Sequence, residues 1–192
     1  MSQAISSPMS QRTPVIPSGV LAMSLFIFTE VMLFSGFISA FSIFKAGSIV
    51  WPPPNQPRLP IEVTALNTGV LLLSGLFLVI ANINFRRQST KKALPWFLAS
   101  TFLAAAFVSI QGYEWAKLIQ FGLTFKSSSY GSYFYLIIGC HALHVFIALY
   151  IMLTQAPAFL KGTIKKENFY TLQAFWYFVV GVWPFLYAIM YF

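Results

Sequence analysis

Charged side chains are scarce in this chain of 192 residues: only 8% are Asp, Glu, Lys or Arg, whereas 58% are hydrophobic. A soluble domain carries about 25% charged residues, so this chain has too few to cover a water-facing globule. Runs of about 20 apolar residues are typical of membrane-spanning helices, and the sequence contains several. The composition therefore predicts an integral membrane protein.

Other features are also missing. Cys140 is the one cysteine, so no intrachain disulfide is possible. The first 20 residues have no basic segment followed by an apolar core and a cleavage site, so we expect the first membrane helix to act as the insertion signal. The net charge is +8, but the basic residues form no long tract, which argues against nucleic-acid binding.

Five apolar segments are long enough to cross a hydrocarbon core of about 30 Å. No alternation typical of a membrane strand competes with them, so the predicted fold is an all-α bundle of five transmembrane helices. Residues 1–17 are expected to form a disordered or extended tail before this single domain. The predicted helices cover residues 18–45, 63–83, 94–119, 131–153 and 169–192, with approximate bounds.

The connectors carry two signals. The segment "GSIVWPPPNQPRLPIE" holds five prolines, and we expect it to lie along the membrane interface in an extended form. Basic residues favour the cytoplasmic side, which predicts a cytoplasmic N-terminus and a periplasmic C-terminus. The side of the N-terminus would then hold Arg12, Arg86, Arg87, Lys91, Lys92, Lys161, Lys165 and Lys166, and the opposite side Lys45, Arg58, Lys117 and Lys126.

Polar residues inside membrane spans are costly and usually face other helices or water. They form the shortlist of candidate functional positions: Glu30, Asn67, Thr68, Ser74, Gln111, Glu114, His141, His144, Trp176, Tyr177, Trp183 and Pro184.

Glu30 is the most unusual of these positions, because it lies near the middle of an apolar span. Its neighbours one helical turn away are Phe26, Ile27, Leu33 and Phe34, so it has no polar partner on its own helix. An ionised carboxylate there would be costly, and we expect a neutral, hydrogen-bonding acid. Its role is either to hold helices together or to relay protons or contact lipid.

His141 and His144 share one helical face and invite a metal or haem interpretation. The chain has no other His and no Asp, and two ligands on one helix rarely complete a site. Hydrogen bonds across helices are therefore the favoured interpretation. Glu114 and Gln111 form either a solvated helix end or an inter-helix cluster, and Cys140 is expected to be a small packing residue.

Five motifs, in order, resemble subunit III of the haem-copper respiratory oxidases. They are "FIFTEVMLFSGF", "WPPPNQPRLPIEVTALNTGVLLLSG", "SIQGYEW", "YGSYFYLIIGCHALHV" and "FWYFVVGVW". The resemblance extends from about Leu21 to the C-terminus. It implies that Glu30 is the intramembrane glutamate that reacts with carbodiimides in the family. Asn67, Thr68, Gln111, Glu114, His141, His144, Trp176 and Trp183 would be inter-helix or lipid-contact positions.

The resemblance implies a non-catalytic subunit of a proton-pumping oxidase that reduces oxygen to water. The chain would hold no cofactor or metal of its own, because haem and copper belong to the partner subunits, while bound phospholipid is expected. It would pack mainly on subunit I, with subunit II and a small subunit IV nearby, support proton uptake, and reside in a bacterial cytoplasmic (inner) membrane.

Two departures stand out. The chain corresponds to the five-helix form of the family rather than the seven-helix form, and Tyr177 and Val180 stand where the family has His and Asp. Four alternatives stay open. They are subunit III of a quinol oxidase, the related protein found with nitric oxide reductases, a small proton-coupled carrier using Glu30, His141 and His144, and a purely structural membrane scaffold.

Overall fold

The computed structural model describes residues 18–192 except for residues 52, 54–56 and 58. The predicted tail of residues 1–17, Arg12 and Arg58 therefore lie outside the described residues. The described chain forms five helices, which are α1 (Ser18–Ala46), α2 (Ile61–Arg86), α3 (Thr90–Gln120), α4 (Ser129–Leu160) and α5 (Lys166–Tyr191). All five are long and apolar enough to cross a membrane, which confirms the predicted fold class.

A helix pairs its backbone N–H and C=O groups internally, and this is required in a membrane because lipid tails offer them no hydrogen-bond partners. The observed helices start close to the predicted positions, but α4 continues to Leu160, seven residues beyond its predicted end. The predicted helix ended at Leu153, just before the polar residues Thr154 and Gln155. The helix passes through Pro157, which removes only one backbone donor. Likewise, α2 begins at Ile61, inside the segment predicted to be extended.

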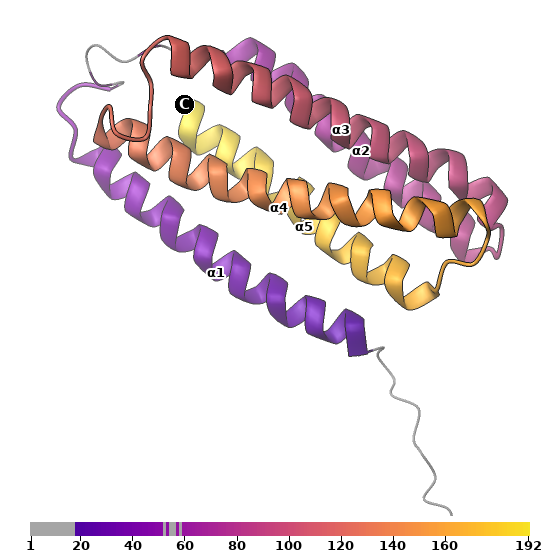
Figure 1. The fold of residues 1–192 in the computed structure, drawn as a ribbon. Coiled ribbons are helices and arrows are strands. Elements are labelled where there is room, and N and C mark those ends of the chain that lie inside the picture. Colours follow the sequence, from indigo (N-terminus) through magenta and orange to yellow (C-terminus); the bar gives the residue numbers. More distant parts are fainter. Residues whose placement is uncertain (1–17, 52, 54–56, 58) are drawn as a thin grey trace, which may run out of the picture.

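The helices form an elongated bundle in which α4 and α5 lie between α1 and the α2–α3 pair (Figure 1). Among the described elements, α1 packs only on α4 and α5. The backbone N–H of Gly19, at the start of α1, donates to Oε1 of Glu167 on α5 over 2.9 Å. This contact fixes one end of α1 to the bundle.

Large aromatic side chains fill the interior. Phe97 of α3 stacks on Phe159 of α4, with ring centroids 4.3 Å apart, and Phe169 of α5 meets Phe159 edge to face. At the opposite end, Trp51 packs on Phe41 and Tyr130, so part of the proline-rich connector covers the bundle. Inside a membrane the hydrophobic effect does not drive helices together, so packing contacts of this kind hold the bundle together.

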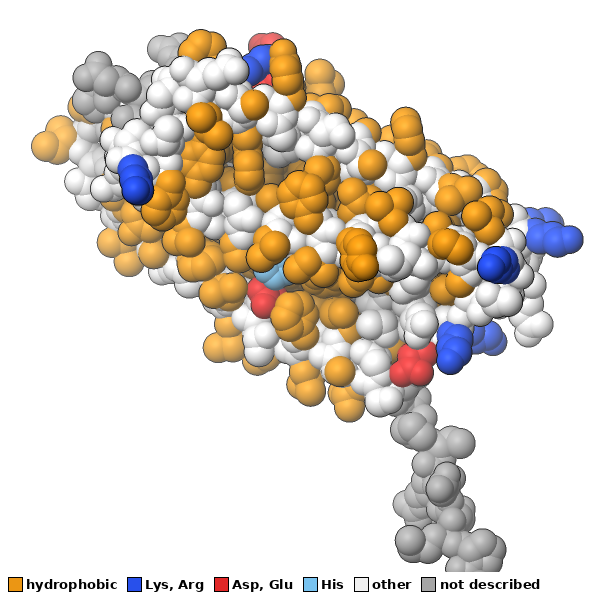
Figure 2. Space-filling model, in the orientation of Figure 1, with side chains coloured by type: hydrophobic (Ala, Val, Ile, Leu, Met, Phe, Trp, Pro, Cys, Tyr) orange, Lys and Arg blue, Asp and Glu red, His pale blue; other side chains and the backbone are white. Residues whose placement is uncertain are grey.

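The outer surface is apolar over most of its length, and the Lys and Arg side chains lie towards the two ends, whereas one acidic side chain is visible beside a His between them (Figure 2). Helix α1 is the least covered, since only Phe34 and Phe41 are buried on it. Phe28 and Met32 on α1 are 65% and 62% exposed. A surface of this kind requires lipid or another apolar chain around it.

Candidate functional site

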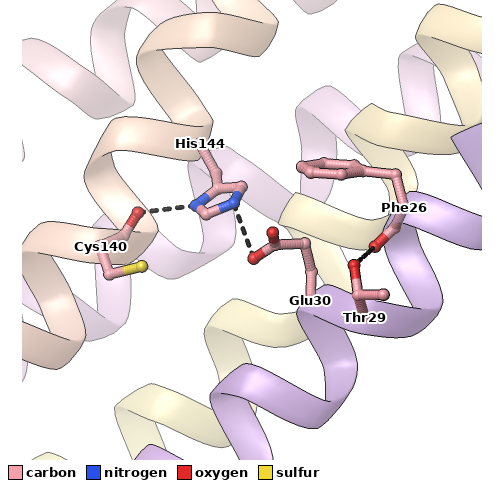
Figure 3. Close-up of polar contacts among 5 residues, drawn as sticks. All are labelled: Phe26, Thr29, Glu30, Cys140 and His144. Carbon is pink, nitrogen blue, oxygen red and sulfur yellow. Dashed lines mark hydrogen bonds and ion pairs between the residues drawn. The ribbon is translucent and has the colours of Figure 1, made fainter.

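Glu30 of α1 faces His144 of α4 where these two helices pack against each other. The Oε2 atom of Glu30 lies 3.0 Å from Nε2 of His144, and the two side chains are 14% and 8% exposed. Figure 3 shows both side chains pointing towards each other across the space between the helices. Glu30 therefore has the partner that its own helix lacks.

The other nitrogen of His144 limits where protons can be. Nδ1 lies 2.8 Å from the carbonyl oxygen of Cys140 (Figure 3), and a carbonyl only accepts, so Nδ1 carries a hydrogen. Oε2 and Nε2 lie at ion-pair distance, although their geometry is not that of a hydrogen bond. With one proton between the two groups, the pair is either neutral acid and neutral imidazole or carboxylate and imidazolium, and its net charge is zero in both forms.

Aromatic rings surround this pair. The centroid of the His144 ring lies 5.6 Å from that of Phe34 and 6.1 Å from that of Phe175. The rings of Phe26 and Phe178 lie within 6.4 Å and 6.3 Å of it. Such surroundings strengthen the Glu30–His144 interaction, because little water is present to compete for it.

His141 is in a different environment from His144, although one helical turn separates them. Its ring stacks on Trp183 of α5 with centroids 5.0 Å apart, and the residue is 2% exposed. Across the part of the chain that the structure describes, no three His, Cys, Asp or Glu residues gather as a metal site would require. The two imidazoles instead have different main partners, Trp183 of α5 for His141 and Glu30 of α1 for His144.

The tryptophans of α5 donate to hydroxyls of α2. Nε1 of Trp183 donates to Oγ1 of Thr68 over 2.8 Å, and Nε1 of Trp176 donates to Oγ of Ser74 over 3.1 Å. Ser100 of α3 adds a third helix, since its hydroxyl donates to the Ser74 carbonyl oxygen over 2.8 Å. Sequence reasoning singled out both tryptophans, Thr68 and Ser74, but missed Ser100.

The sequence matches one family over nearly its full length. A profile of the family described as Cytochrome c oxidase subunit III matches residues 6–192. This chain belongs to that family. Cytochrome c oxidase subunit 3 of Mammuthus primigenius is 34% identical over 189 residues, which cover 93% of this chain and 71% of the relative. The Loxodonta africana and Hippopotamus amphibius proteins of the same name are 33% and 32% identical with the same coverage.

Tyr177 and Val180 of α5 stand where the sequence resemblance led us to expect His and Asp. The Tyr177 hydroxyl is buried and has no hydrogen-bond partner among the described residues. Val180 packs against Gly75 of α2, where an added Cβ would lie 3.1 Å from Cγ1 of Val180. Val180 thus lies at a close contact between α2 and α5.

The end of the bundle nearest the C-terminus holds three more of the predicted polar positions, Asn67, Gln111 and Glu114. The amide nitrogen of Asn67 donates to the Phe107 carbonyl oxygen over 3.1 Å and faces Oε1 of Gln111 at 3.4 Å. Glu114 is only 6% exposed and accepts a bond from Nζ of Lys117 over 3.2 Å. The interpretation of Glu114 as a solvated helix end is therefore wrong, because helix packing buries it.

Proposed function

We propose that this chain is the non-redox subunit III of a haem-copper terminal oxidase of the cytochrome c type. The match over residues 6–192 and the curated relatives, all named cytochrome c oxidase subunit 3, support this proposal. Membership of the family makes the chain part of an oxidoreductase complex of the respiratory chain. The finer proposal is that the other subunits carry out the reduction of oxygen to water.

The role that we propose for this subunit is to stabilise subunit I and support its proton uptake. The Glu30–His144 pair is the observation that carries this proposal. It brings an acid and an imidazole together between two membrane-spanning helices, α1 and α4. The rest of the chain leaves most of α1 uncovered. A proton shared by the two groups would keep the pair neutral.

Haem and copper are proposed to reside in partner subunits, since both imidazoles of this chain already contact its own side chains. The proposed partners are subunit I as the main contact, subunit II, a small subunit IV, and phospholipid over the apolar surface. The proposed location is a bacterial cytoplasmic membrane, which follows from the resemblance to the five-helix form alone.

Removal of this subunit from the complex tests the proposal. We expect the haem absorption spectrum to be unchanged, while proton uptake slows and the enzyme loses activity after fewer turnovers. The controls are the complete complex and a complex carrying Glu62→Gln, which changes an exposed carboxylate at the start of α2. A lost haem band, or unchanged proton uptake and lifetime, would contradict the proposed role.

The alternatives differ in measurable ways. Assays of the purified complex with reduced cytochrome c, a quinol or nitric oxide separate the three members of the superfamily. The carrier alternative requires the chain alone to move protons or solute in liposomes. Within the described part of the chain, His141 makes no hydrogen bond to the Glu30–His144 pair, so the relay of three residues has less structural support than the pair.

A further inference from the structure

A second group of buried polar side chains lies near the end of the bundle where α2 begins and α5 ends. The group consists of Thr64 and Asn67 on α2, Gln111 on α3 and Tyr191 on α5. Thr64 and Asn67 are each 1% exposed, and Gln111 and Tyr191 are each 7% exposed. We call these four residues the α2–α3–α5 polar cluster. It shares no residue with the Glu30–His144 pair.

The orientations of the two amides follow from their contacts. Nδ2 of Asn67 must face the Phe107 carbonyl, because a carbonyl oxygen only accepts hydrogen bonds. The same nitrogen faces Gln111, so Gln111 presents its oxygen to Asn67 and its Nε2 elsewhere. One acceptor, Oδ1 of Asn67, and one donor group, Nε2 of Gln111, are thereby left over.

Four atoms of the cluster have no hydrogen-bond partner among the described residues. They are Oγ1 of Thr64, Oδ1 of Asn67, Nε2 of Gln111 and the hydroxyl oxygen of Tyr191. The Tyr191 hydroxyl is close enough to Thr64 and Gln111 to interact with both side chains, but neither contact has the geometry of a hydrogen bond. Unpaired polar atoms are costly in a protein interior, and lipid tails offer no partners. A small polar molecule bound among them would remove that cost.

The chemistry of the four atoms selects the kind of molecule. Nε2 of Gln111 only donates, Oδ1 of Asn67 only accepts, and the two hydroxyls do both. A cation would be repelled by the amide N–H groups, and an anion by Oδ1. Water donates and accepts, and buried waters typically make about three hydrogen bonds to groups of this kind.

One cavity also borders the cluster, at Tyr191. This cavity of about 430 Å³ lies beneath the connector before α2 and is lined by Trp51, Ile61, Tyr130 and Tyr191, among others. Tyr191 thus borders both this cavity and the cluster. We propose that Thr64, Asn67, Gln111 and Tyr191 form a binding site for ordered internal water that links α2, α3 and α5.

High-resolution cryo-electron microscopy of the purified complex containing this subunit tests the proposal. We expect a density peak within hydrogen-bonding distance of at least three of the four atoms. The peak should disappear or move in Tyr191→Phe, which removes only the hydroxyl. It should persist in Tyr187→Phe, the matched control, because the Tyr187 hydroxyl donates instead to the Ile61 carbonyl oxygen over 3.0 Å.

A second measurement does not depend on the map. Infrared difference spectra between H₂¹⁶O and H₂¹⁸O should contain an isotope-sensitive water band that Asn67→Leu and Tyr191→Phe both lose. The control variants for this measurement are Asn84→Leu, whose amide bonds to its own helix, and Tyr187→Phe.

Three results would overturn the water site. They are direct bonds among the four side chains with no density between them, a peak with the short contacts of a metal cation, and spectra that neither variant changes. The proposed oxidase function fails separately, if no haem-containing chain purifies with this subunit. In that case the water site is still tested on the full chain in lipid nanodiscs.

Discussion

At the scale of single residues, the sequence identified Glu30 and His144 but not their contact. Helical spacing defines the neighbours of Glu30 on its own helix, and all of them are apolar. His144 comes from α4, and the packing of α1 on α4 that joins them depends on tertiary structure. The expectation that Glu30 is a neutral acid stays a prediction, because either form of the pair fits the observed distance.

Substitutions at Glu30 should separate its hydrogen bond from its charge. Glu30→Gln should assemble normally, because the amide can donate to Nε2 of a neutral His144 at similar volume. Glu30→Ala should lower the free energy of unfolding by about 1–3 kcal/mol, since it leaves that nitrogen buried without a partner. Thermal denaturation of the purified complex measures both effects.

The matched control is Glu62→Gln, which should change neither assembly nor denaturation. Equal loss of stability in Glu30→Gln and Glu30→Ala would mean that a charged carboxylate is structurally required.

Infrared spectroscopy reports which atom of the pair holds the proton. We expect a carbonyl stretching band of a protonated acid that Glu30→Gln removes, because the aromatic surroundings disfavour separated charges. Carboxylate bands that disappear in Glu30→Gln, with no protonated-acid band, would show that His144 holds the proton instead.

At the scale of helices, the sequence predicted that five membrane-spanning helices exist and in which order they follow. It did not predict which helices contact one another. Length and hydropathy suffice to place five spans, because only a helix satisfies its backbone inside lipid. Small residues at close contacts are harder to recognise, since nothing in the sequence distinguishes Gly75 from Gly69. In the structure, Gly75 touches Val180, and an added Cβ at Gly69 would meet nothing within 4 Å.

The contact between α2 and α5 at Gly75 leads to a prediction. Gly75→Leu should destabilise the bundle by about 1–3 kcal/mol or more, because the larger side chain must displace Val180. Gly69→Leu, on the same helix, should have little effect. Thermal denaturation of the two variants compares them, and equal stability would show that α2 and α5 separate readily at Gly75.

At the scale of the whole molecule, the basic residues give the bundle two different ends. Seven described basic residues gather at the end where α1 and α5 begin: Arg86, Arg87, Lys91, Lys92, Lys161, Lys165 and Lys166. Lys45, Lys117 and Lys126 lie at the other end. The structure thus places the basic residues unequally at the two ends, as the sequence indicated.

This asymmetry predicts the orientation in the membrane, with the more basic end in the cytoplasm. Reporter fusions should show a cytoplasmic N-terminus and a periplasmic C-terminus. Replacing Lys161, Lys165 and Lys166 with Gln should weaken the preference, while the same change at Lys126 should not. Fusions that give the reverse location in the unmodified chain would contradict the prediction.

The closeness of Glu30 and His144 also bears on how the electric field of a respiring membrane acts on them. A proton crossing between their atoms covers at most the 3.0 Å that separates Oε2 and Nε2. That path is about a tenth of a hydrocarbon core of about 30 Å. A potential of 100 mV would therefore bias the transfer by only about 0.2 kcal/mol. The position of this proton should respond to its chemical surroundings and remain nearly independent of membrane voltage.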